Sequence, residues 1–218
     1  MKKLVIVSVL LLNLVSQKLY AQKIEINPFG FCDDIKGYEY KDAVLKPDSV
    51  IDLGIGNEYI KIPTLKIDSL KLEQFKNLKI LRIGNFYLDI LNVKDLGKLN
   101  LLVLKISKCR IKEIPIGIFK NKHLEFLAIN DNQLTSIPKD VGKLKQLKRL
   151  ILIENQIANL PYKQLKKLKY LIEFNVWDNP VVENESQAKK LNKLYKIIDN
   201  HRVQQGIPKL YTVEPTNE

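Results

Sequence analysis

The sequence predicts an α/β solenoid, in which stacked coils place their strands side by side in one curved parallel sheet with an irregular or short-helical convex side. Three observations support this prediction. Similar segments recur at a nearly constant spacing, apolar residues alternate within each segment, and a polar residue, usually asparagine, recurs at one place in the apolar pattern. A strand with one apolar face cannot bury that face alone, so stacked copies are needed to form a continuous core.

The repeats follow the pattern L-x-x-L-x-L-x-x-N/C-x-L, as in LEFLAINDNQL at Leu124. In this segment Leu127 and Ile129 point to one face of a strand, while Phe126 and Ala128 point to the other. The offsets between the starts of five successive copies are 23, 23, 23 and 24 residues, and a sixth copy, which matches the pattern less well, precedes them. The copies begin at Val50, Leu78, Leu101, Leu124, Leu147 and Leu171.

The recurring polar position predicts a ladder of side chains inside the solenoid. After each strand the backbone turns away while it is still buried, and buried N–H and C=O groups need partners. An asparagine amide supplies two donors and one acceptor. The ladder is expected to comprise Cys109, Asn132, Asn155 and Asn179.

With these motifs, residues 50–179 resemble the leucine-rich repeat family, in its 23-residue variant with Ile-Pro or Leu-Pro after the asparagine. The resemblance is to exported proteins of bacterial type. It implies a non-catalytic module that binds a protein or peptide, although a fold does not by itself determine a function.

Both ends of the repeat region are expected to carry caps. Residues 22–49 are the predicted N-terminal cap, with Tyr38, Val44, Leu45 and Pro47 in a short helical segment. Residues 180–200 are the predicted C-terminal capping helix. For the tail, residues 201–218, one added short strand is an open expectation.

The capping helix is predicted to start at Asn184, an N-cap residue with Gln187 three positions later. Its apolar face favours a lid over the last coil, and a membrane-surface helix is the alternative that its lysines suggest. This face comprises Ala188, Leu191, Leu194, Tyr195 and Ile198.

Residues 1–21 have the order of a secretory signal peptide: two lysines, an apolar run from Leu4 to Val15, and a small residue, Ala21. We expect cleavage before Gln22, export to the periplasm, cell surface or medium, and no stable membrane insertion after cleavage. The alternative is an uncleaved anchor, because Leu19 is larger than a cleavage site prefers.

The net charge is +12, and removal of three signal lysines leaves 33 − 24 = +9. Lysine accounts for 32 of the 36 basic residues. Because base readout and bidentate phosphate binding favour arginine, this composition predicts a solvated lysine surface and no nucleic-acid partner. Cys32 precedes the first coil while Cys109 lies about two coils beyond it, a separation that favours two unpaired thiols without settling the question.

No catalytic residue, cofactor or metal site is expected. His123 and His201 lie far apart in the repeat register, and neither has a cysteine or carboxylate at metal-ligand spacing. Nucleophile-elbow, zinc-protease and phosphate-loop motifs are absent from the sequence.

The candidate binding site is the concave face, where the third, fifth, seventh and eighth positions of each copy point. Apolar residues at these positions suggest an exposed contact patch with a charged rim, including an acidic column of Asp131, Glu154 and Asp178. Strand propensity alone is the other explanation for the β-branched residues. A glycan or other anionic polymer is the alternative ligand. The candidate ligand-binding residues are Ile80, Arg82, Val103, Lys105, Phe126, Arg149, Ile151, Ile153 and Trp177.

Overall fold

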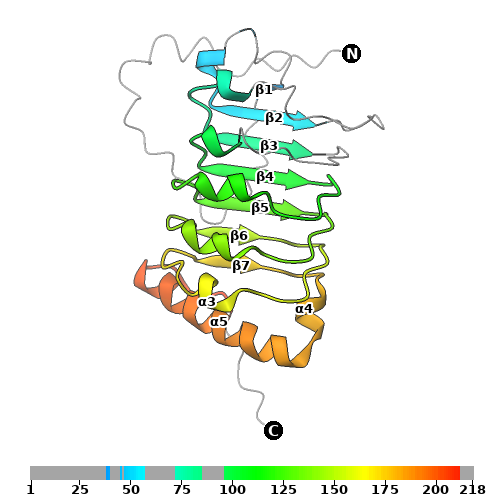
Figure 1. The fold of residues 1–218 in the computed structure, drawn as a ribbon. Helices are drawn as coiled ribbons and strands as arrows, with labels where there is room; N and C mark the ends of the chain where they lie inside the picture. The colour runs from blue at the N-terminus through cyan, green and yellow to red at the C-terminus, as the bar shows by residue number, and fades with distance from the viewer. Residues whose placement is uncertain (1–37, 40–44, 46, 57–71, 85–95, 212–218) are drawn as a thin grey trace, which may run out of the picture.

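The structure is a computed structural model that describes residues 38–39, 45, 47–56, 72–84 and 96–211. The predicted signal segment 1–21, most of the predicted N-terminal cap and Cys32 lie outside this part of the chain. The described residues form an elongated stack of coils, and each coil contributes one strand to a single sheet (Figure 1).

The sheet contains seven parallel strands in sequence order. Equivalent residues of successive repeats face each other across it: Ile80 pairs with Val103, Val103 with Phe126, and Phe126 with Arg149. The repeat alignment is therefore also the register of the sheet, and the predicted solenoid architecture is present. The strands are β1 (Tyr38–Glu39), β2 (Asp52–Gly56), β3 (Ile80–Gly84), β4 (Val103–Ser107), β5 (Phe126–Asn130), β6 (Arg149–Ile151) and β7 (Glu173–Asn175).

The solenoid core lies behind one face of the sheet and runs through all the described coils. Leu81, Leu104, Leu127 and Leu150 occupy the same place in four successive strands, and each is fully buried. Complete burial of a leucine side chain stabilises the fold by about 1.5–3 kcal/mol. Because each coil adds the same leucines against its neighbour, the core grows by repetition.

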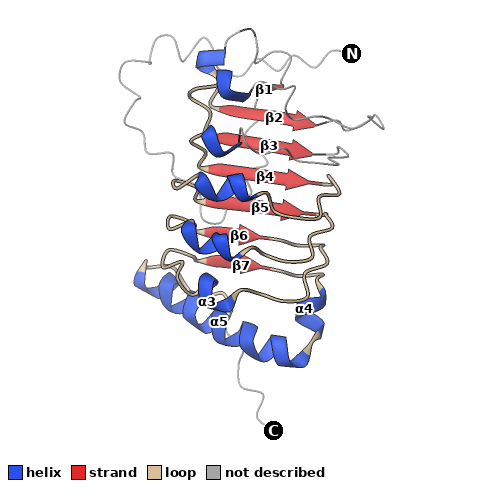
Figure 2. Cartoon of the chain, viewed as in Figure 1, coloured by secondary structure: helices blue, strands red, loops and turns tan. Residues whose placement is uncertain are grey.

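The convex side is built from short helical turns (Figure 2). Pro115 and Pro138 directly precede two of them in an extended conformation, with φ of −63° and −59° and ψ of 128° and 145°. These φ values are the ones that the proline ring fixes, so proline fits there without strain. The coils approach closely here: a Cβ atom on Gly97 would lie 3.0 Å from the carbonyl oxygen of Gly117. The turns are 3₁₀ helices at Pro47–Ser49, Leu72–Gln74, Leu96–Lys98, Ile116–Lys120 and Lys139–Lys143, followed by α3 (Tyr162–Leu165).

The N-terminal end differs from the predicted cap. Tyr38 lies in β1, whose two residues pair with Leu53 and Gly54, so its assignment to a helical segment is wrong. A strand at this place supplies hydrogen-bond partners to the edge of β2, which a helix would leave open. Leu45 is exposed, and a 3₁₀ turn begins at Pro47, while Val44 lies outside the described residues.

At the C-terminal end, α4 (Pro180–Glu183) and α5 (Glu185–Gln204) close the last coil. The side chain of Asn184 accepts a hydrogen bond from the N–H of Gln187 at 3.0 Å, as expected of the N-cap. Leu191, Leu194 and Ile198 of α5 join the solenoid core, so the helix acts as a lid. It ends at Gln204, four residues beyond the predicted boundary at 200.

The described part of the tail, residues 205–211, forms no added strand. Instead, the Tyr211 hydroxyl accepts a hydrogen bond from the N–H of Phe174 at 2.7 Å and donates one to its carbonyl oxygen at 2.8 Å. Arg202 donates to the carbonyl oxygen of Ile172 at 3.0 Å. The Asp199 carboxylate holds the tail by accepting from the N–H of Leu210 at 2.8 Å. Side chains thus satisfy part of the backbone at the last strand, where a neighbouring strand is lacking.

Candidate binding face

The asparagine column joins each coil to the preceding one. The Asn132 amide oxygen accepts from the N–H groups of Cys109 and Ile111, at 3.0 and 3.2 Å. Its amide nitrogen donates to the carbonyl oxygens of Ile106 and Asn130, at 3.1 and 2.6 Å. One side chain therefore bonds four main-chain groups, and the carbonyl oxygen of Asn130 also accepts from the N–H of Lys108 at 3.3 Å.

The next two asparagines repeat this arrangement. Asn155 accepts from the N–H of Leu134 at 3.1 Å and donates to the carbonyl oxygen of Ile129 at 2.8 Å. Asn179 accepts from the N–H of Ile157 at 2.9 Å and donates to the carbonyl oxygen of Leu152 at 2.8 Å. Both amides are buried, so the bonds are shielded from water.

Cys109 occupies the same column one coil earlier and is also buried. Its thiol donates to the carbonyl oxygen of Ser107 at 3.1 Å, and its sulfur lies 3.9 Å from the carbonyl oxygen of Ile83. A thiol is a weak donor with a single hydrogen, so it satisfies fewer groups than an amide.

Next to the ladder lies a column of residues with left-handed backbone conformation, which the sequence does not reveal. Lys108, Asp131, Glu154 and Asp178 all have φ between 54° and 57°, although none of them is glycine. This left-handed conformation disfavours residues that carry a Cβ. It turns each chain out of its strand and points a charged side chain outward at the same edge of the sheet.

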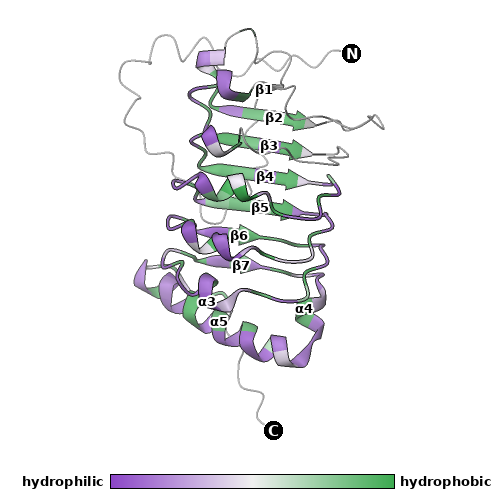
Figure 3. Cartoon of the chain, viewed as in Figure 1, coloured by the Kyte–Doolittle hydropathy of each residue, from purple (hydrophilic) through white to green (hydrophobic). Residues whose placement is uncertain are grey.

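The concave face carries a second apolar layer, separate from the solenoid core. It comprises Ile80, Val103, Phe126, Ala128 and Ile151, with Leu102 and Ile153 packed against it. Figure 3 shows hydrophobic residues along β3, β4 and β5. Neighbouring strands lie about 4.8 Å apart, so these side chains pack against one another across the sheet.

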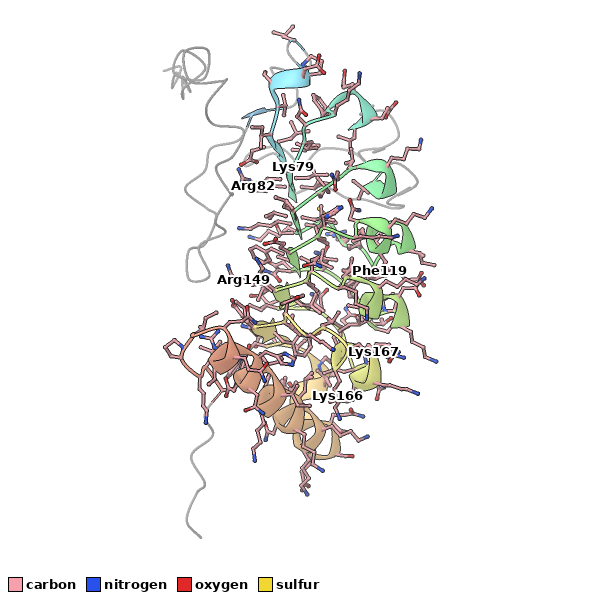
Figure 4. All side chains as sticks on the ribbon, turned by 90° about the vertical axis from the view of Figure 1, so that its left-hand side faces the viewer. Lys79, Arg82, Phe119, Arg149, Lys166 and Lys167 are labelled. Atoms are coloured by element: carbon pink, nitrogen blue, oxygen red, sulfur yellow. The ribbon has the colours of Figure 1, made fainter. Side chains whose placement is uncertain are left out.

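Two cations extend this layer around Phe126. The Arg149 guanidinium lies 4.5 Å from the centroid of the Phe126 ring, and the Lys105 ammonium lies 5.5 Å from it. Arg149 also donates to the Glu173 carboxylate at 2.6 Å. In Figure 4 the labelled Arg82 and Arg149 lie on the concave side of the sheet, opposite Phe119 and Lys167.

The expectation of an exposed apolar patch is therefore wrong for most of its members. Phe126 and Arg149 each expose only 5% of their surface, and Ile80, Val103 and Ile151 are also buried. The physical reason is packing between strands, together with stacking of Arg149 on Phe126. Arg82, Lys105 and Ile153 are half-buried.

An ion pair marks the N-terminal part of the face. The Arg82 guanidinium lies 2.6 Å from one carboxylate oxygen of Asp52. The other oxygen of Asp52 is buried and has no hydrogen-bond partner. Burial raises the pKa of Asp52, and the attraction and hydrogen bond of Arg82 oppose that rise.

The exposed aromatic group of this region is Trp177, which leaves 67% of its surface accessible two residues after β7. The main-chain N–H of Trp177 donates to the side-chain oxygen of Asn175 at 3.0 Å, which orders the turn that carries the tryptophan. Ile153 holds the equivalent place in the preceding repeat. Trp177 is therefore the candidate residue whose large apolar side chain is open to a partner.

The acidic column borders this exposed area. A hydrogen bond and repulsion from Asp131 raise the pKa of Glu154, and repulsion from Asp178 adds to the effect. Lys108 lies 3.9 Å from Asp131 and offsets part of it. With Asp131 and Asp178 on either side of Glu154, the column forms a local concentration of negative charge.

Sequence reasoning missed one buried amide. Asn121 donates to the carbonyl oxygens of Leu96 and Ile118, at 2.9 and 3.2 Å, and accepts from the N–H of Leu101 at 3.3 Å. It stands in a convex column that holds Leu144 and Leu168 in later repeats. The argument used for the ladder would have found it, because an asparagine among buried leucines needs partners.

No group of histidine, cysteine and acidic residues suited to a metal ion occurs among the described residues. Within the same residues, no helix has both the length and the apolar character required to cross a membrane.

Comparison with known proteins identifies the family. The family model described as "Leucine-rich repeat region" matches residues 60–202, more than half of the chain. The chain therefore belongs to the leucine-rich repeat family, as its motifs indicate. A search of curated protein sequences returns no match.

Many solved structures share the fold. A leucine-rich repeat protein of Leptospira interrogans is 25% identical, with a TM-score of 0.54 over 72% of this chain and 39% of that protein. This chain thus spans well under half of the Leptospira protein. An internalin of Listeria monocytogenes is 26% identical over 49% of this chain and 30% of its own, with a TM-score of 0.42. A chain of the BIR3–SERK2 complex of Arabidopsis thaliana is 27% identical over 60% of this chain and 68% of its own, with a TM-score of 0.45.

Proposed function

We propose that this chain is an exported, non-catalytic module that binds a protein or peptide through the concave face of its sheet. Leucine-rich repeat solenoids present extended binding surfaces of this kind. The observation that carries the proposal is Trp177, an exposed aromatic residue beside a half-buried isoleucine and an acidic column. Export rests on the signal-like order of residues 1–21.

In this proposal the concave face has a supporting part and a contacting part. The packed layer around Phe126 supports the face, because its members contact one another. Trp177 and Ile153 supply accessible apolar surface, and exposed tryptophans contribute strongly to protein interfaces. The partner therefore offers an apolar group to Trp177.

The charge beside Trp177 specifies the partner further. Asp131, Glu154 and Asp178 are all exposed and lie along one edge of the sheet. Complementary charge steers association and suppresses wrong partners. A protein or peptide with lysine or arginine next to an apolar side chain fits this arrangement.

The test is capture of partners from an envelope fraction with matched variants. The chain from Gln22 onward is immobilised as wild type, Trp177→Ser and Tyr170→Ser, and captured proteins are quantified by mass spectrometry. Tyr170 is the control because it is also an exposed aromatic residue, at 49%, but precedes β7. We expect a protein that wild type and Tyr170→Ser retain and that Trp177→Ser loses by about tenfold or more. Equal capture by all three variants would contradict the proposal.

A further inference from the structure

A second surface of the molecule carries ordered positive charge. On the flank where the strands begin, lysines recur on both sides of a buried convex column. Lys120 and Lys122 bracket buried Asn121, and the same exposed–buried–exposed order recurs at Lys143–Lys145 and Lys167–Lys169. The flank set comprises Lys76, Lys120, Lys122, Lys143, Lys145, Lys167 and Lys169, all of them exposed.

Two lysine rows follow from the repeat itself. Successive strands stack about 4.8 Å apart, so lysines at equivalent places in successive coils form rows along the solenoid axis. Figure 4 views the molecule from this flank, with the labelled Lys79 near the sheet and Lys167 nearer the convex turns. The result is a narrow strip of positive charge along this flank.

Little negative charge within the described residues neutralises this strip. Lys143 forms an ion pair with Asp140 at 3.0 Å, on the same 3₁₀ helix. The nearby Glu125 carboxylate is already held by Lys148 at 2.7 Å. Most ammonium groups of the strip therefore repel their neighbours, and an external polyanion would relieve that repulsion.

We propose that this flank binds a linear acidic polysaccharide. A linear polymer with one carboxylate on each ring, or on every second ring, matches a narrow strip better than a bilayer, which presents a plane. Lysine ammonium groups are hydrated point charges suited to scattered carboxylates. Tyr170, directly after Lys169, offers one exposed ring face on which a sugar can stack.

Nucleic acid fits the flank less well. Single-stranded nucleic acid binds on repeated aromatic platforms within a basic groove. Among the described residues that follow the lysines of the strip, the exposed rings are those of Tyr170 and His123, too few for a repeated platform. The strip also contains no arginine, the residue that grips phosphate with two parallel bonds.

The probe is a fluorescent oligogalacturonate, and its binding is measured by anisotropy between about 50 and 200 mM salt. The flank variant carries Lys120→Gln, Lys122→Gln, Lys143→Gln and Lys145→Gln. The control carries Lys189→Gln, Lys190→Gln, Lys193→Gln and Lys196→Gln on α5, with the same charge change at exposed positions. Thermal melts check that both variants fold.

We expect the flank variant to lose about tenfold or more in affinity, with a shallower dependence on salt, and the control to lose about twofold or less. Equal losses would reduce the effect to net charge and overturn the proposal, as would no binding by wild type at the higher salt. Tighter binding to anionic lipid vesicles or single-stranded DNA, with the same dependence on the flank lysines, would overturn the choice of polysaccharide. Trp177 and the concave face are unchanged in both variants, so this test is independent of the protein-binding proposal.

Discussion

At the residue scale, one amide per coil connects the backbone of adjacent coils. Asn155 contacts the carbonyl oxygens of Ile129, Leu152 and Ile153 and the N–H of Leu134. A leucine side chain has the same number and branching of heavy atoms but offers no donor or acceptor. The ladder therefore stabilises the fold through polar groups placed inside an apolar core.

We predict that Asn155→Leu lowers the free energy of unfolding by roughly 1–3 kcal/mol for each buried group left unpaired. Lys166→Ala, at an exposed position after α3, should change it by less than about 0.5 kcal/mol. Chemical denaturation of the two variants measures the difference. Equal effects would show that the asparagine does not satisfy buried groups.

Glu154 gives a second prediction, on pH. Its pKa is raised in the folded state, chiefly by Asp131, so the fold favours the protonated carboxyl. The associated stability is present below the ordinary value of 4.5 and is lost as the pH rises through the folded pKa. Glu154→Gln should therefore raise the melting temperature at pH 7, and the gain should vanish below pH 4.5.

Glu113→Gln provides the control for Glu154, because it removes one negative charge at another exposed position. The chain is strongly basic, so a general charge effect would lower the melting temperature in both variants. A gain for Glu154→Gln alone identifies repulsion within the acidic column. A pH-independent response of Glu154→Gln would argue against that repulsion.

At the element scale, β7 is the last strand of the sheet, and side chains from α5 and the tail cover its outer edge. Tyr211 bonds both main-chain groups of Phe174 and stacks on Tyr195, with ring centroids 4.2 Å apart. Burial raises the pKa of Tyr195 to about 12. An open strand edge is a template for pairing with another chain, so this cover protects the molecule.

We predict that Tyr211→Phe destabilises the protein by roughly 1–3 kcal/mol for each Phe174 group that loses its partner. Hydrogen exchange at the Phe174 amide should rise with it, and size-exclusion chromatography should show a larger tendency to associate. Tyr170→Phe removes a hydroxyl from an exposed ring and should leave all three measurements unchanged. Retained amide protection in Tyr211→Phe would show that other groups cover the edge.

The strands were predictable from sequence because one period of 23 residues sets both the alternation and the register, as Ile80, Val103 and Phe126 show. The left-handed turns were not predictable, because Lys108 and Glu154 are not glycines and nothing in the sequence marks their positive φ. The edge cover by Tyr211 lies 37 residues from its partner Phe174, beyond any local pattern. Burial of Phe126 depends on Arg149 lying over its ring, which alternation alone does not indicate.

At the scale of the whole molecule, stacking gives the solenoid surfaces of different character. The concave face bears a packed apolar layer that leads to Trp177 and an acidic column, while the flank where the strands begin bears rows of lysine. Because each coil repeats the same positions, a charged residue type that recurs at one repeat position forms a column of charge along the stack. The same geometry that builds the core therefore also organises the surfaces.

The proposed function requires that a partner protein contact the concave face near Trp177. Its most direct test is site-specific photo-crosslinking, with a photoreactive phenylalanine analogue placed at Trp177, Ile153, Tyr170 or Ile116 in the chain from Gln22 onward, exposed to an envelope fraction. Ile116 is exposed on the convex side and Tyr170 precedes β7, so both serve as controls. We predict that one protein crosslinks from positions 177 and 153 and does not crosslink from positions 170 and 116. Crosslinking of that protein from 116 alone, or equally from all four positions, would contradict it.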